Sequence, residues 1–157
     1  MKTSDAGKHE IKHWEGWRLE PYICPAGKWT IGAGSRLYPG SKVEGLSFDG
    51  KAWHGKITPQ TAEQLLDRDL AICEKALAEL VTVPLEQDQY DALVSFIFNV
   101  GRNAFAGSTL LRRLNKKLYR AAAEEFPRWC HDDHGKVIVG LLRRRNHEKA
   151  LFLKSEA

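Results

Sequence analysis

The feature that most constrains the fold is a long amphipathic segment near the middle of the chain. Thr58 followed by Pro59 is typical of a helix start, because a threonine hydroxyl accepts a hydrogen bond from a first-turn N–H group and proline fits the first helical position. Apolar residues then recur at helical spacing, at Leu66, Leu70, Cys73, Leu77 and Leu80. Val83 and Pro84 end the pattern, so we predict a helix from residue 58 to about residue 80.

The part of the chain before this helix favours short strands and turns. In KWTIGAG, the β-branched pair Thr30 and Ile31 precedes glycines, which predicts a short strand running into a tight turn. LSFDGKAW predicts two short strands around an Asp49-Gly50 turn. Ahead of both, an apolar face made by Ile11, Trp14 and Leu19 predicts a short helix that Gly16 ends, with a loop leading to the strand.

The part after the long helix favours further helices. Residues 85–100 form a buried helical pattern through Tyr90, Leu93, Val94 and Ile97. Ser108 is a candidate cap for a helix that runs through Leu111, Leu114 and Leu118, and a last helix is expected after Gly140. The pattern as a whole predicts an α+β fold in which helix predominates.

Composition fits a chain that buries a core as one domain or as two closely joined lobes. The 157 residues are 43% hydrophobic and 28% charged. The first sixteen residues contain no apolar run, so we expect neither a secretory signal peptide nor a membrane anchor. The three cysteines form no CxxC pair and are expected to be free thiols, with Cys73 and Cys130 packed in the core.

The chemistry is concentrated in WEGWRLEPYICPAGKWT, which places a carboxyl, a thiol and a hydroxyl at Glu15, Cys24 and Thr30. Glu15 lies between Trp14 and Trp17, and this apolar setting suits a general acid, which must hold its proton near neutral pH. A thiolate at Cys24 would accept a hydrogen bond from water, whereas a neutral thiol does so poorly. If Cys24 takes part in a reaction, we therefore expect the rate of that reaction to depend on the protonation of its thiol.

The spacing of these three residues resembles that of the phage-type lysozymes, glycoside hydrolase family 24. That family carries a glutamate, eight residues, an aspartate or less often a cysteine, five residues and a threonine. The resemblance continues through four further segments and covers nearly the whole chain in order: ITPQTAEQLLDRDL, QDQYDALVSFIFNVG, GSTLLRRLN and VGLLRRRNHEKALF.

The resemblance implies a single lysozyme-like domain over residues 1–157. A small lobe with a β-hairpin would take about 15–57, a linking helix about 58–80, and a helical lobe about 81–157 together with the N-terminal helix. The cleft would lie where the lobes meet. No cofactor and no metal are implied.

The implied reaction is hydrolysis of the β-1,4 bond between N-acetylmuramic acid and N-acetylglucosamine in peptidoglycan. Glu15 would protonate the leaving oxygen, while Cys24 and Thr30 would position the attacking water on the opposite face of the sugar. A covalent role for Cys24 is chemically possible, but no residue pattern favours it over water activation. A lytic transglycosylase, which needs the acid but no water-holding partner, remains an alternative.

Family resemblance also suggests substrate-binding and acid-orienting residues. Phe98 and Asn99 match a segment on the helical side of the cleft, where an aromatic face and an amide would contact the N-acetyl sugars. Gly34 and Arg36 match positions on the wall of the β lobe, although the family often has an apolar residue at the latter. An arginine beside the acid is implied as well, at Arg143 or Arg144.

The expected partner is bacterial peptidoglycan, with no nucleic acid and no membrane anchor. The formal charge of +4 and a pI near 9.0 suit a polyanionic wall, and they leave open a basic wall- or nucleic-acid-binding module without catalysis. The HDDH segment, 131–134, is interpreted as a turn rather than a metal site. By resemblance, we expect a monomer that waits in the host bacterial cytoplasm and reaches the periplasm or cell wall after a holin breaches the membrane.

Overall fold

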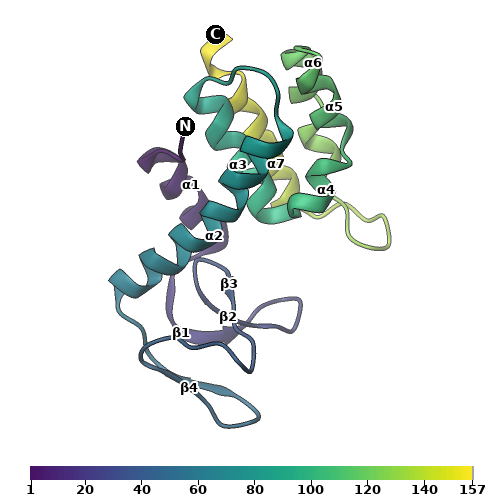
Figure 1. The fold of residues 1–157 in the computed structure, drawn as a ribbon. Coiled ribbons are helices and arrows are strands. Elements are labelled where there is room, and N and C mark those ends of the chain that lie inside the picture. Colours follow the sequence, from purple (N-terminus) through teal and green to yellow (C-terminus); the bar gives the residue numbers. More distant parts are fainter. Residues whose placement is uncertain (157) are drawn as a thin grey trace. The chain divides into compact units, whose positions relative to one another are not determined.

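The structure is a computed structural model that describes residues 1–156, and it divides into two compact units. The β unit comprises residues 9–69, and the helical unit comprises residues 1–8 and 70–156. The helix α1 (Asp5–Glu15) and the helix α2 (Pro59–Leu80) each contribute residues to both units. The predicted α+β class, with helix predominant, is confirmed (Figure 1).

The β unit contains an antiparallel sheet and a separate hairpin. The sheet has the order β1-β2-β3, made of β1 (Arg18–Ile23), β2 (Trp29–Gly32) and β3 (Ser35–Arg36). The hairpin pairs β4 (Leu46–Phe48) with β5 (Trp53–Gly55), as the sequence predicted. Asp49 accepts hydrogen bonds from the backbone N–H groups of Lys51 and Ala52, which closes the turn.

A small hydrophobic core holds the β unit together. Its fully or nearly buried members come from β2, from the residue after β3, from β5 and from the segment that leads into the first turns of α2, and they are Ile31, Leu37, Trp53, Ile57, Ala62 and Leu65. The start of α2 is fixed as expected, because the Thr58 hydroxyl accepts a hydrogen bond from the Thr61 N–H group at 3.1 Å. Packing against this core sets the position of β2, on which Thr30 lies.

Two expectations for the first forty residues are wrong. The segment between α1 and β2 is largely a strand, β1, rather than a loop, and Leu19 belongs to this strand rather than to the apolar face of the helix. The pairing of β1 with β2 is irregular between Arg18 and Tyr22, where a bulge accommodates Pro21. The proline and the mixed polarity of RLEPYI hide this strand from a pattern search.

The helical unit packs its remaining helices around a cluster of aromatic side chains. Its helices are α3 (Gln87–Val100), α4 (Arg102–Ala106), α5 (Thr109–Asn115), α6 (Tyr119–Ala123), the 3-10 turn η1 (Phe126–Arg128), α7 (Val139–Phe152) and the 3-10 turn η2 (Lys154–Glu156). Figure 1 shows α3 beside α7, and these two helices pack against each other. The Phe96 ring meets the rings of Phe105, Phe126 and Trp129 edge-on, with centroids 5.4 to 6.4 Å apart.

Two helix boundaries in this unit differ from the prediction. Ser108 does cap α5, since its hydroxyl accepts a hydrogen bond from the Leu111 N–H group. The helix nevertheless ends at Asn115, because Lys117 adopts a φ of 63°, and Leu118 instead precedes α6. The last helix begins at Val139, so Gly140 lies inside its first turn. Among the described residues, no helix has the length and apolar character that crossing a membrane requires.

Candidate functional site

The β unit brings together the carboxyl, thiol and hydroxyl groups singled out from the sequence. Glu15 is the last residue of α1 and is partly exposed. Cys24 follows β1 directly and is also partly exposed, while Thr30 lies on β2 with only 4% of its surface accessible. The register of the sheet places Thr30 opposite Tyr22 on one side and opposite Arg36 on the other.

The Glu15 carboxylate lies directly against Gly34. A Cβ atom built at Gly34 would lie 2.9 Å from Glu15 Oε2, which is closer than non-bonded carbon and oxygen atoms normally approach. Gly34 also has a φ of +78°, a conformation that other residues adopt at a cost. Both observations explain why this position holds glycine, and they define one wall around the carboxylate.

A tight turn presents the Cys24 sulfur to donors of its own backbone. The Cys24 N–H group donates to the Lys28 carbonyl at 2.9 Å, and the Gly27 N–H group donates to the Cys24 carbonyl at 2.8 Å. The pKa of the Cys24 thiol is lowered, chiefly by a hydrogen bond from the Lys28 N–H group, with further donation from Ala26 and from the Thr30 hydroxyl. The turn therefore stabilises the thiolate relative to that of an ordinary exposed cysteine.

The Thr30 hydroxyl stands between two acceptors. Its Oγ1 atom donates to the Lys28 carbonyl at 2.9 Å, and it is also within reach of the Cys24 sulfur. A hydroxyl has a single proton, so it serves one of these acceptors at a time. When the proton points to the carbonyl, the oxygen lone pairs remain available to accept a hydrogen bond from water.

Tyr22 is a site residue that the sequence analysis missed. Burial raises the pKa of its phenol, the nearby Arg18 guanidinium lowers it, and the charges of Glu15 and Cys24 raise it further. The phenol therefore lies within electrostatic range of both groups. Side chains two residues apart along a strand lie on one face, so a strand prediction for this segment would have pointed to Tyr22 beside Cys24, but the sequence analysis expected a loop here.

Arg36, the other predicted residue of this unit, is exposed at the end of β3. Its guanidinium stacks over the Tyr38 ring, 4.7 Å from the centroid. The sheet register thus brings Arg36 next to Thr30 along the backbone, while its side chain is held by the tyrosine.

The other predicted residues belong to the helical unit, where one of them, Arg144, is part of a buried polar network together with its neighbour Arg145. Arg144 and Arg145 are 4% and 0% exposed, and both pair with the buried Glu148, at 3.3 and 2.9 Å. Arg144 also donates to the Ser95 carbonyl at 3.0 Å, and the Ser95 hydroxyl donates to Glu148. Burial raises the pKa of Glu148, while the two guanidinium groups and Ser95 act in the opposite direction.

This network also fixes an amide on α3. Arg145 donates from Nη2 to Asn99 Oδ1 at 2.8 Å, so the amide oxygen is occupied and its NH₂ group is the part left for other partners. The adjacent Phe98 is half-buried, and Arg143 is exposed on α7. The sequence indicated neither Arg145 nor Glu148, because their importance depends on which face of α7 is buried.

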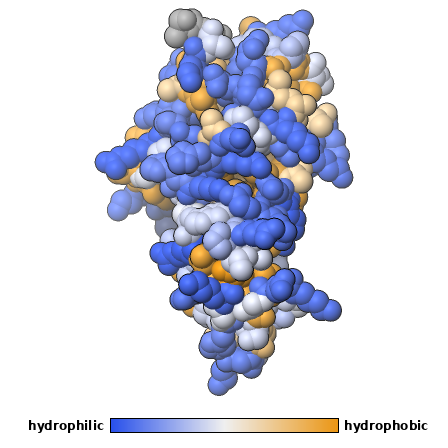
Figure 2. Space-filling model, turned by 90° about the vertical axis from the view of Figure 1, so that its left-hand side faces the viewer, coloured by the Kyte–Doolittle hydropathy of each residue, from blue (hydrophilic) through white to orange (hydrophobic). Residues whose placement is uncertain are grey.

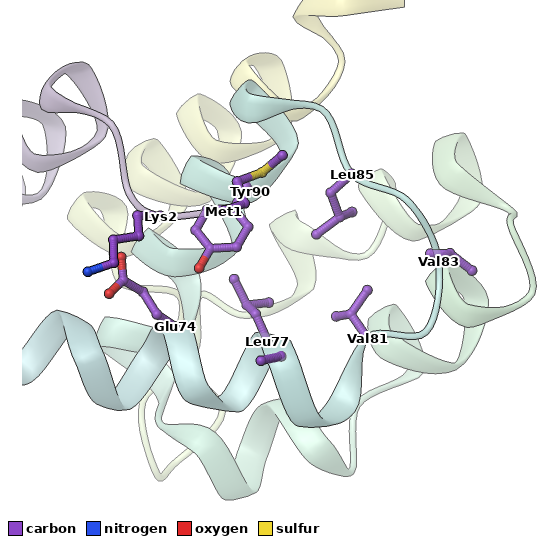
Figure 3. A pocket seen from close by; sticks show the side chains of 9 residues that line it. Met1, Lys2, Glu74, Leu77, Val81, Val83, Leu85 and Tyr90 are labelled. Atoms are coloured by element: carbon purple, nitrogen blue, oxygen red, sulfur yellow. The ribbon is translucent and has the colours of Figure 1, made fainter.

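A separate hollow of about 310 Å³ in the helical unit has a different character (Figure 3). Its walls are mainly aliphatic, including Leu77, Val81 and Leu85. Its carboxylate, Glu74, already accepts hydrogen bonds from the backbone and hydroxyl of Thr3 at 2.8 and 2.9 Å. This lining does not offer an acid paired with a water-holding group, so the candidate catalytic residues are those of the β unit.

The remaining sequence candidates have structural roles. Cys73 and Cys130 are both 4% exposed, as expected for core residues, and the three cysteines are free thiols. In the HDDH segment, Asp132 accepts hydrogen bonds from the backbone N–H groups of His134 and Lys136, which supports the interpretation as a turn. Figure 2 shows a face on which hydrophilic side chains predominate and hydrophobic patches are small.

Comparison with known proteins gives consistent matches over nearly the whole chain. A family model described as Phage lysozyme matches residues 12–148. The endolysin of Salmonella phage P22 is 46% identical over 153 residues, which cover 98% of this chain and 99% of that protein. The endolysin of Acyrthosiphon pisum secondary endosymbiont phage 1 is 40% identical over 155 residues, with coverage of 97% and 98%.

Solved structures agree with these sequence matches. A mutant of P22 lysozyme superposes with a TM-score of 0.80 at 44% identity, covering 98% of this chain and 99% of that one. The muramidase domain of SpmX from Asticaccaulis excentricus also gives a TM-score of 0.80, at 38% identity and 97% coverage of both chains.

Proposed function

Because this chain belongs to the phage lysozyme family and is a peptidoglycan hydrolase of the lysozyme type, we propose that it is an N-acetylmuramidase. It would cleave the β-1,4 bond between N-acetylmuramic acid and N-acetylglucosamine. The observation that carries this proposal is the grouping of Glu15, Cys24 and Thr30 around Tyr22 and Gly34 in the β unit. An acid and a water-holding pair are the two parts that glycoside hydrolysis requires.

Glu15 is proposed as the general acid that protonates the leaving glycosidic oxygen. Its carboxylate lies at the end of a helix and against the backbone of Gly34. Because Gly34 has no side chain, the carboxylate can approach this backbone closely, and the backbone limits where the carboxylate can move. Positional restriction of this kind is valuable in catalysis, because proton transfer needs hydrogen-bonding distance between the acid and the leaving oxygen.

Cys24 and Thr30 are proposed to hold the attacking water. The water would donate one hydrogen bond to the Cys24 thiolate and another to Thr30 Oγ1, whose own proton is directed to the Lys28 carbonyl. An oxygen lone pair of the water would then be free to attack the anomeric carbon. As the new C–O bond forms and the glycosidic bond breaks, the thiolate takes the water proton and Glu15 gives its proton to the leaving oxygen.

Contacts with the sugars are proposed for Gly34, Arg36, Phe98 and Asn99. The best supported is Asn99, because Arg145 occupies its amide oxygen and leaves the NH₂ group as a donor for an N-acetyl carbonyl. Arg143 and Arg144 are proposed for the acid-orienting role; Arg143 is exposed, whereas Arg144 is buried and its guanidinium pairs with Glu148 and donates to the Ser95 carbonyl.

In the cell, we propose that the enzyme acts in host cell lysis. It would accumulate as a monomer in the host bacterial cytoplasm and reach the wall after a holin has opened the membrane. The family membership supports this proposal through the endolysin relatives of phages.

Digestion of purified peptidoglycan tests the proposed activity. Wild-type protein and a Glu15→Gln variant are compared, and the new sugar ends are identified by mass spectrometry. Reducing muramic acid ends that are absent with the variant would support the muramidase. Anhydro-muramic acid ends would assign a lytic transglycosylase instead, and no cleavage by the folded wild-type protein would refute catalysis.

A further inference from the structure

A groove of about 380 Å³ lies along β1 in the β unit and has no assigned role. Its lining includes two cations, Arg18 and Lys56, and one carboxylate, Glu20. These residues come together because the Ile57 N–H group donates to the Leu19 carbonyl at 2.9 Å, which holds the segment after β5 alongside β1. Tyr22 also lines the groove, and the charges of Glu15 and Cys24 contribute to the raised pKa of its phenol.

The Arg18 guanidinium is held in place by an aromatic ring rather than by a carboxylate. The bulge in β1 brings its guanidinium over the Tyr22 ring, 4.4 Å from the centroid. Stacking occupies the face of a guanidinium and leaves the N–H groups at its edge free to bind an anion. Within the described part of the chain, neither Arg18 nor Lys56 has a carboxylate partner, whereas Lys12 pairs with Glu63 and Arg68 pairs with Asp69.

The balance of charges defines the kind of ligand. Two cations and one carboxylate leave a net charge of +1 in the groove, which matches a singly charged carboxylate better than a doubly charged phosphate. Leu19 and Pro21 add apolar surface beside the cations, as a short peptide with small apolar side chains would require.

We propose that the groove formed by Arg18, Tyr22 and Lys56 binds a carboxylate of the lactyl-peptide arm that muramic acid carries in peptidoglycan. This inference rests on the proposed function, since it assumes a peptidoglycan strand in the site. The arm would be fixed at one end by the groove while Tyr22 connects the groove to Glu15 and Cys24. The groove would thereby favour glycan strands that carry their peptide stems.

Binding measured without catalysis separates this inference from the proposed function. Fluorescently labelled glycan fragments are titrated with the Glu15→Gln variant, alone and combined with Arg18→Gln or with Lys56→Gln. Lys51→Gln is the matched control, because Lys51 lies at the exposed tip of the β4-β5 turn and outside this groove. Circular dichroism confirms that each variant is folded.

Three fragments distinguish the ligand groups: one with intact stems, one with all carboxylates converted to neutral amides, and one with stems removed to leave the lactyl carboxylate. We expect each groove variant to weaken binding of the intact fragment by about threefold, the size of an exposed charge pair, and to leave the amidated fragment unaffected. In the intact fragment the lactyl carboxyl group is amide-bonded to the peptide, so a loss confined to that fragment would identify a carboxylate of the peptide. A loss that also appears with the stem-free fragment would show that the groove accepts the free lactyl carboxylate as well. Equal weakening for the intact and amidated fragments, or none for either, would overturn the proposal.

Discussion

The contact between Gly34 and Glu15 makes a quantitative prediction about catalysis. In Gly34→Ala, the new methyl group would lie 2.9 Å from Glu15 Oε2, so the carboxylate has to move by about 0.5 Å to restore an ordinary van der Waals contact. A displacement of about 1 Å at a reacting group can cost on the order of 100-fold in rate. We therefore expect kcat to fall by about tenfold, with KM little changed.

The same substitution also carries a conformational cost that must be separated from this effect. Gly34 has a φ of +78°, where alanine is less stable than glycine by about 1–2 kcal/mol. Gly50→Ala is the matched control, because Gly50 has a φ of +96° and a Cβ there would meet no atom within 4 Å. Both variants should lose similar stability in urea unfolding, but only Gly34→Ala would displace the carboxylate.

Initial rates of reducing-end release from peptidoglycan measure the outcome. The two variants are compared at a temperature well below both unfolding transitions, so that each is fully folded. Equal kcat values for Gly34→Ala and Gly50→Ala would refute the reasoning, since they would show that the position of the Glu15 carboxylate does not limit the reaction.

Three further predictions concern the thiol, the buried charges and a helix cap. Thr30→Val removes a hydrogen-bond donor to Cys24, so the pKa of the Cys24 thiol should rise. The rate of thiol alkylation, measured against pH, should then increase at a higher pH than in the wild type, and an unchanged profile would contradict the hydrogen bond from Thr30 to Cys24. Glu148→Gln leaves two buried guanidinium groups without their carboxylate and should cost about 3–5 kcal/mol in urea unfolding. Glu124→Gln, at an exposed pair, should leave the free energy of unfolding nearly unchanged, and similar losses for the two variants would show that the buried network is not coupled. Ser108→Ala should lower the free energy of unfolding by about 1 kcal/mol through loss of the α5 cap, and no change would mean that the cap is dispensable.

Local signals made the main helices predictable from the sequence. Thr58 and Ser108 cap helices through their own hydroxyl groups, and these interactions involve residues only three positions away. The break at Lys117 was not predictable in the same way, because the apolar spacing from Leu114 to Leu118 continues the helical pattern through it. The left-handed conformation of a lysine has no sequence signal.

Of the candidate site in the β unit, the residues of the short motif could be predicted from the sequence, but the backbone donors and the aromatic stacking around them could not. Glu15, Cys24 and Thr30 lie within sixteen residues, and their order and spacing indicated the chemistry. The donors that favour the thiolate are backbone N–H groups of Lys28 and Ala26, which every residue possesses and which only the turn directs at the sulfur. The stacking of Arg18 on Tyr22 likewise depends on a bulge that shifts the strand register.

The configuration of the first product tests the proposed mechanism most directly. Hydrolysis of a soluble peptidoglycan fragment is followed by proton NMR from the first seconds, before the anomers equilibrate. Attack by a water held by Cys24 and Thr30 on the face opposite the leaving group inverts the β-linked carbon, so the α-anomer of the muramic acid end should appear first. Initial appearance of the β-anomer would contradict the account, because it would require a covalent intermediate and would make Cys24 the nucleophile instead of a holder of water.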